Sequence, residues 1–189
     1  MLLHREPVLV AGSTHPGLAQ SIAAHLGVTL VPVRFTRFSN ENLKVRVEAA
    51  VRDRDVFVIQ TSCPPVNEAL METLLLLDAL RGAGAGRITV VLPYFPYVRS
   101  DKMDEPGVSI SARLVADLLV TAGANRMLVM DLHSPQIHGF FRVPVDHITA
   151  VPTLCASLAE AGAGVERVVV ATDIGEAKDA GRFAARLGV

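Results

Sequence analysis

The sequence predicts an α/β fold with a doubly wound, mainly parallel sheet. Short apolar runs of strand length alternate along the chain with helical segments of roughly ten to fifteen residues. Two of these runs, 88–92 and 127–130, are apolar at almost every position, which is typical of strands buried on both faces. Both observations favour a parallel sheet with helices on each side.

The elements of the first half follow from their periodicity. Apolar or alternating residues between turn residues predict four strands, over 7–11, 28–35, 43–47 and 55–61. Leucine and isoleucine at helical spacing predict two helices, over 18–26 and 66–80. Two polar residues of the second helix, Asn67 and Glu72, are expected to cap it or to lie on its surface.

The second half continues the same alternation. We expect strands or extended segments over 88–92, 127–130, 143–148 and 168–171, the last as a sixth buried run. Helices are expected over 109–121, 152–161 and 177–187. This pattern predicts that the sheet that begins at Pro7 is complete before Val151, so the predicted domains are 1–150 and 151–189.

Composition restricts the class of protein and its partners. Half of the chain is hydrophobic, a fifth is charged and the net charge is -1, which predicts a globular protein. The basic residues are spread along the chain, so neither nucleic acid nor an anionic membrane is expected as a partner. Its two cysteines are far apart, and no signal-like start or long apolar run occurs; the expected location is therefore cytoplasmic.

The end of the strand at 127–130 offers candidate metal ligands. Asp131 and His133 follow this strand, and ligands of open parallel sheets bind beyond the carboxyl ends of the strands. If the extended conformation continues through Leu132, both side chains point to the same side. A carboxylate and an imidazole suit a divalent ion that keeps waters and phosphates as its other ligands. The alternative is a helix cap followed by a solvated histidine.

Other polar residues follow predicted strands and are candidates for ligand binding. Arg99 and Lys102 lie in a long charged loop, 93–107, where they could contact phosphates or could simply be solvated. Phe38 lies at a polar turn and could stack on a base or pack within the turn. Asp173 follows the predicted strand at 168–171 and places a second carboxylate at a strand end.

Taken together, these segments resemble the ribose-phosphate pyrophosphokinase family, also called phosphoribosyl-diphosphate synthetases. The likeness extends from Val8 to about Leu187. It is densest in the motif FSN and in three longer stretches: VNEALMETLLLLDALR, RITVVLPYFPYVRSDK and ISARLVADLLVTAGANRMLVMDLHSPQIHGFFRVPVDH. A match of this length is more specific than any single motif within it.

The resemblance implies a type I phosphoribosyltransferase-like fold and an enzyme that transfers the diphosphoryl group of ATP to ribose 5-phosphate with Mg2+. It also implies a homo-oligomer built from dimers, up to a hexamer, in which the turn around Phe38 reaches the ATP of a neighbouring subunit. The ATP-binding residues that it implies are Phe38, Asn40, Glu41, Asn42, Arg99, Ser100, Asp101 and Lys102. The metal positions that it implies are His133, with Asp131 beside it, and Asp173, which falls on a second metal or ribose-phosphate position.

The chain also departs from the family pattern. Five positions differ from the residues that the family usually has. The family usually has an acidic residue at Asn42, Gln at Ser100 and Arg at Gly107. It usually has Gly at Glu176 and Arg at Asp179. The catalytic loop with its Lys and Arg would follow Val189, so no catalytic residue is assigned, and the second domain at 151–189 is expected to be incomplete. The chain is then either part of a longer synthetase or a shortened, non-catalytic relative that binds nucleotide or a catalytic homologue.

Overall fold

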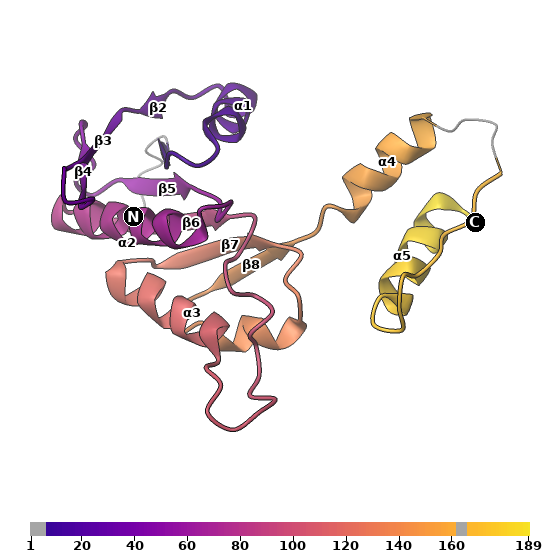
Figure 1. The fold of residues 1–189 in the computed structure, drawn as a ribbon. Helices are drawn as coiled ribbons and strands as arrows, with labels where there is room; N and C mark the ends of the chain where they lie inside the picture. The colour runs from indigo at the N-terminus through magenta and orange to yellow at the C-terminus, as the bar shows by residue number, and fades with distance from the viewer. Residues whose placement is uncertain (1–6, 162–165) are drawn as a thin grey trace. The chain divides into compact units, whose positions relative to one another are not determined.

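The computed structural model describes residues 7–161 and 166–189, which form two compact units that meet in sequence at Ile148 and Thr149. Each unit is described by itself. The first contains all of the described strands, and the regular elements described in the second are helices (Figure 1).

A six-stranded sheet forms the centre of the first unit. Its strand order is β2-β1-β5-β6-β7-β8, and every neighbouring pair is parallel. The strands are β1 (Val8–Ala11), β2 (Leu30–Val31), β5 (Asp55–Ile59), β6 (Arg87–Leu92), β7 (Arg126–Met130) and β8 (Val145–Ile148). The predicted α/β class with a mainly parallel sheet is therefore confirmed.

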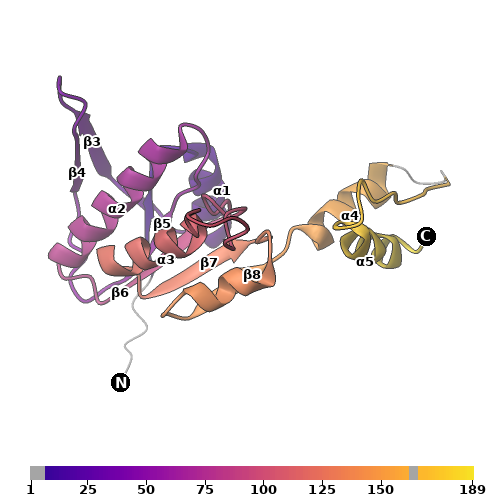
Figure 2. The ribbon, with the colours of Figure 1, turned by 60° about the horizontal axis from the view of Figure 1, so that its bottom comes forward.

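The two faces of this sheet are covered by different helices. One face packs on α2 (Val66–Gly82) and α3 (Ser111–Ala122), through the core that contains Val10, Val58 and Val90. The opposite face carries Leu9 and Ile59, which pack on α1 (Pro16–Leu26) (Figures 1 and 2). Successive residues of a strand point to opposite faces, so a continuous apolar run becomes a strand buried on both sides.

The register aligns the buried residues across the sheet. Val10 pairs with Val58, Val58 with Val90 and Val90 with Met127, and all four side chains are completely buried. Because neighbouring parallel strands start level with one another, their carboxyl ends also lie at one edge of the sheet. The loops that follow β1, β5, β6 and β7 leave from this edge.

A separate antiparallel hairpin is formed by β3 (Val33–Arg37) and β4 (Leu43–Val47), and it extends away from the main sheet (Figure 2). The single strand predicted over 28–35 is wrong, because the chain divides at Pro32 into β2 of the main sheet and β3 of the hairpin. Proline has no N–H to donate to a sheet, which favours a break at this residue.

The second unit contains α4 (Val151–Ala161) and α5 (Ala177–Leu187), which contact each other. The buried strand predicted over 168–171 is wrong: the segment is not a strand, and Val168 and Val170 are 81% and 78% exposed. An apolar run is buried only where other elements cover it, and the described part of this unit places neither a neighbouring strand nor a helix over it.

None of the described helices is both long and apolar enough to cross a membrane. A short helix that the sequence does not predict, η1 (Pro135–Phe140), follows β7 and buries Ile137.

Candidate functional site

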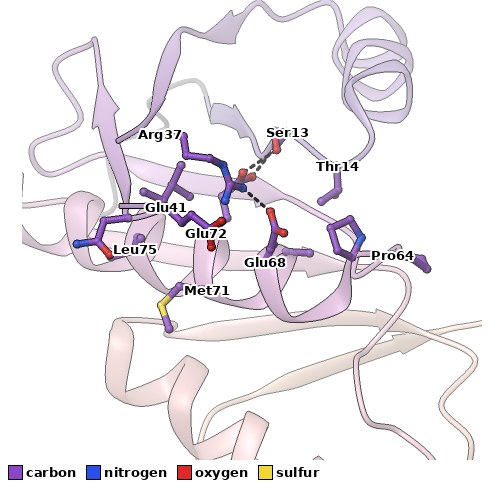
Figure 3. Close-up of a pocket in the computed structure, with 13 residues that line it drawn as sticks. Ser13, Thr14, Arg37, Glu41, Pro64, Glu68, Met71, Glu72 and Leu75 are labelled. Atoms are coloured by element: carbon purple, nitrogen blue, oxygen red, sulfur yellow. Dashed lines mark hydrogen bonds and ion pairs between the residues drawn. The ribbon is translucent and has the colours of Figure 1, made fainter. Parts of the chain in front are cut away.

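A cavity of about 620 Å³ lies in the first unit beside α2 (Figure 3). Three parts of the chain surround it: the turn after β1, the tip of the β3–β4 hairpin, and the segment from Pro64 into α2. The polar side chains that line it are Ser13, Thr14, Arg37, Glu41, Asn42, Glu68 and Glu72. The rest of the lining is apolar.

Glu72 lies at the wall of the cavity and is only 6% exposed. Its carboxylate accepts hydrogen bonds from the backbone N–H of Ser13 at 2.7 Å and from the Ser13 hydroxyl at 2.6 Å. The side-chain amide of Gln60 donates a third hydrogen bond at 2.8 Å. Glu72 therefore joins the turn after β1 to the end of β5, and its expected place on the helix surface is wrong.

Gln60 extends this buried network toward the start of α1. It is 2% exposed. Its side-chain oxygen and the carbonyl oxygen of Thr61, the latter at 2.7 Å, are both within reach of the single proton that the Thr14 hydroxyl can donate. Gly12 leaves the space for this amide, because a Cβ at Gly12 would lie 2.3 Å from the Gln60 Cδ. Buried polar groups are usually hydrogen-bonded, and the side chains of Glu72 and Gln60 both have hydrogen-bond partners in this network.

The hairpin tip carries the predicted nucleotide-binding residues of the first half. Phe38 is 50% exposed, and its backbone N–H donates to the carbonyl oxygen of Asn42 at 2.9 Å. The Asn40 side chain accepts from the backbone N–H of Asn42 at 3.2 Å, and Glu41 has a left-handed backbone with φ 65°. The tip is thus a tight turn that holds Phe38 at the surface, while Glu41 and Asn42 border the cavity.

The charged loop after β6 contains the other predicted nucleotide-binding residues. Ser100 anchors the loop on α3: its hydroxyl donates to the carbonyl oxygen of Ser109 at 2.7 Å and accepts from the backbone N–H of Ser111 at 3.3 Å. Arg99 and Lys102 are exposed, and neither has an ion-pair partner among the residues that the structure describes. Both cations are therefore available to an anionic ligand.

The loop after β6 meets the segment after β7 through one short hydrogen bond. The Ser134 hydroxyl donates to the carboxylate of Asp101 at 2.5 Å, although the two residues are 33 positions apart in sequence. β6 and β7 are neighbouring parallel strands, so their carboxyl ends and the loops that follow them lie side by side. This contact places the predicted nucleotide loop next to the predicted metal segment.

Asp131 and His133 are exposed at the end of β7. Asp131 has φ 44°, so the extended conformation ends there, and strand alternation does not place the two side chains on one side. The backbone N–H of Leu132 donates to the His147 ring at 3.1 Å, which fixes the segment against β8. Within 7–161 and 166–189, no group of three His, Cys, Asp or Glu side chains is arranged to hold a metal ion.

Asp173 lies in the second unit. Its carboxylate accepts a hydrogen bond from the backbone N–H of Glu176 at 3.0 Å, which closes a turn just before α5. This is the behaviour of a local turn residue. Its assignment as a metal ligand stays a prediction.

Ion pairs connect the strands at the opposite edge of the sheet. Arg126 forms a two-point pair with Asp146 of β8, at 2.5 Å and 2.8 Å, and Arg87 pairs with Asp55 of β5. The hydrogen bond from Arg126 lowers the pKa of the Asp146 carboxyl below its usual range. These pairs hold neighbouring strands together away from the candidate site.

Comparison with known proteins identifies relatives of this chain. Residues 7–123 match the model of the N-terminal domain of ribose phosphate pyrophosphokinase. A Streptomyces coelicolor protein is 52% identical over 184 residues, and the ribose-phosphate pyrophosphokinase of Deinococcus radiodurans is 49% identical over 190 residues. Each alignment covers 97% of this chain and 58% of the relative.

A solved structure is also similar. The phosphoribosylpyrophosphate synthetase from Mycobacterium smegmatis is 43% identical, with a TM-score of 0.93 over 97% of this chain and 62% of that chain. This neighbour has a type I phosphoribosyltransferase-like fold, as the resemblance implied. The present chain thus spans less than two thirds of the length of the relatives that it matches.

Proposed function

Since this chain belongs to the ribose phosphate pyrophosphokinase family, we propose that it serves the transfer of the diphosphoryl group of ATP to ribose 5-phosphate. The product would be 5-phosphoribosyl 1-diphosphate, a precursor for nucleotide biosynthesis. The hydrogen bond from Ser134 to Asp101 is the observation that best supports this role. It joins the two loops that the sequence assigns to nucleotide and metal.

In this proposal the loop after β6 binds the ATP phosphates. Arg99 has a planar guanidinium that can donate two hydrogen bonds to a phosphate, and Lys102 adds a mobile positive charge. Ser100 holds the loop on the start of α3. Asp101, fixed by Ser134, would orient the loop beside the metal segment.

The metal segment is proposed to hold Mg2+ with few protein ligands. Asp131 and His133 offer one carboxylate and one imidazole at an exposed strand end. Mg2+ usually keeps several waters and is bound through one or two protein ligands together with substrate phosphates, so two donors without a third fit such a site. The ion, when bound, would neutralise charge on the phosphate oxygens. Asp173, in the second unit, is proposed separately for a second metal or ribose-phosphate position.

The hairpin is proposed to contact nucleotide across a subunit interface. Phe38 presents an exposed aromatic ring, and Asn40, Glu41 and Asn42 place polar groups next to it. A ring held at the surface by a tight turn is suited to stack on a base. This role requires a homo-oligomer built from dimers, with hexamers as the larger form, which we propose together with a cytoplasmic location where ATP is available.

We also propose that residues 1–150 form the N-terminal domain and that 151–189 begin a second, similar domain. The division of the described chain between Ile148 and Thr149 supports this boundary. The roles proposed for this chain are binding roles, and no catalytic residue is assigned.

Isothermal titration calorimetry with Mg-ATP tests the proposal. Arg99→Ala is expected to weaken binding about tenfold or more, because a charged hydrogen bond to phosphate contributes roughly 1.5–3 kcal/mol. Arg113→Ala is the matched control, since Arg113 is exposed on α3, outside the loop, and forms a long ion pair with Asp117 at 3.8 Å. Equal affinity of the wild type and Arg99→Ala would contradict the proposed nucleotide site.

A second titration addresses the metal. His133→Ala is expected to weaken ATP binding when Mg2+ is present and to change it little when the metal is chelated. A loss of the same size with and without Mg2+ would argue against a metal ligand at this position.

A further inference from the structure

The cavity beside α2 carries an excess of negative charge. Among the described residues that line it, Arg37 is the one cation, against the three carboxylates of Glu41, Glu68 and Glu72, so their formal charge is minus two. Arg37 pairs with Glu68, which leaves the other two carboxylates without this cation (Figure 3). In a partly enclosed site such an excess attracts cations and repels phosphates.

Glu72 is the buried carboxylate among the three, whereas Glu41 and Glu68 are exposed. Its three hydrogen bonds come from neutral donors, the Ser13 backbone, the Ser13 hydroxyl and the Gln60 amide. Glu72 is only 6% exposed. Even so, no Lys, Arg or His within the described chain forms an ion pair with it. Buried carboxylates are almost always paired with a cation or a metal. A cationic ligand in the cavity would supply the missing counter-charge.

The remaining walls are suited to an apolar group. Leu43 and Leu75 line the cavity together with Met71 and the ring of Pro65. The volume of about 620 Å³ lies within the range of small-molecule sites, roughly 300–1,000 Å³. A ligand with a positive end and an apolar body would therefore match both the charge and the walls.

We propose that this cavity binds a small organic cation, a primary amine or guanidinium carried on an apolar body. The cationic end lies toward Glu72 and Glu41, and the apolar body lies against Met71 and Leu75. None of Arg99, Lys102, Asp131 and His133 lines the cavity. Glu41 and Asn42 do line it, so the cavity shares its rim with the hairpin tip that is proposed to contact nucleotide. Its test does not depend on the proposed function.

Tryptamine is a suitable probe, because the chain has no tryptophan and the indole fluorescence would come from the ligand alone. Its fluorescence anisotropy is expected to rise as protein is added. Indoleacetate, with a similar ring and a carboxylate in place of the amine, is expected to bind at least about tenfold more weakly, since like charge disfavours binding. Tryptamine affinity is expected to fall as salt is added.

Charge-neutral variants locate the site. Glu41→Gln and Glu68→Gln are each expected to weaken tryptamine binding by about three- to tenfold. Both side chains are exposed, so both variants are expected to fold. Glu48→Gln is the control, since it removes the same charge from the end of the same hairpin, where Glu48 pairs with Arg34 outside the cavity.

Three results would overturn the inference. The first is an anisotropy that does not change with protein, and the second is equal binding of tryptamine and indoleacetate. The third is an equal effect of Glu48→Gln and the two cavity variants, which would indicate general surface attraction. Circular dichroism spectra that match the wild type ensure that a loss of binding reports the cavity and not misfolding.

Discussion

Replacing Glu72 by alanine is expected to lower the free energy of unfolding of the first unit by about 3 kcal/mol. Glu72 accepts three hydrogen bonds, two from Ser13 and one from Gln60. Ser13 lies at the surface, so water can replace its partner, whereas Gln60 is 2% exposed and its amide would stay unsatisfied. A buried unsatisfied donor costs about 1–3 kcal/mol, and each other lost hydrogen bond about 1 kcal/mol.

Glu68→Ala is the matched control, because it removes the same side chain one helical turn earlier on α2. Glu68 pairs with Arg37, and both side chains are more than half exposed, at 56% and 52%. Such exposed pairs contribute only about 0–1 kcal/mol. Urea unfolding followed by far-ultraviolet circular dichroism would measure both variants.

Glu72→Gln adds a finer comparison. Glutamine keeps an oxygen that can accept from the Gln60 amide, and its new N–H can donate to the Ser13 hydroxyl, so we expect a loss of only about 1 kcal/mol. The expected order of stability is wild type, then Gln, then Ala. If Glu72→Ala were no more destabilising than Glu68→Ala, the buried network would have no role in stability and the reasoning would fail.

Two further predictions concern the same unit. Gly12→Ala is expected to cost about 1–3 kcal/mol in urea unfolding, because the new methyl group would displace the Gln60 amide. Gly17→Ala in α1 should be neutral or stabilising, because its new methyl group would meet the His15 ring at an ordinary contact distance of 4.0 Å. Asp146 has a pKa below its ordinary value of 3.8 through the hydrogen bond from Arg126, so its stabilisation is present above that pH and is lost as the pH falls through the lowered pKa. Asp146→Asn should therefore flatten the acid limb of the stability curve measured by thermal unfolding, and an unchanged limb would contradict this assignment.

Local periodicity was sufficient to predict most of the helices and strands. The run at 127–130 became β7 and the leucine stripe at 66–80 became α2, because their apolar residues fit one type of structure and one buried face. Periodicity failed at 168–171, where Val168 and Val170 have the composition of a buried strand but are exposed. Burial depends on which elements cover a segment, and a local pattern does not contain this information.

The sequence predicted one part of the candidate site and missed another. That the loops after β6 and β7 would meet follows from a parallel sheet, and the hydrogen bond between Ser134 and Asp101 agrees with it. Glu72 gave no such signal, because a glutamate on a helix is usually at the surface. One clue was available in principle: Glu72 lies three positions after Ala69 and four before Leu76, so it shares a helical face with these two buried apolar residues.

The sequence by itself determined the strand and helix order, the family, and the placement of Arg99, Asp131 and His133 after the ends of strands. These properties follow from local patterns and from the geometry that all parallel sheets share. Only the tertiary structure decided that Glu72 meets Ser13, 59 positions away, and that a negatively charged cavity lies beneath the hairpin. Contacts of this kind arise where separate segments pack together, and their partners have no fixed spacing in the chain.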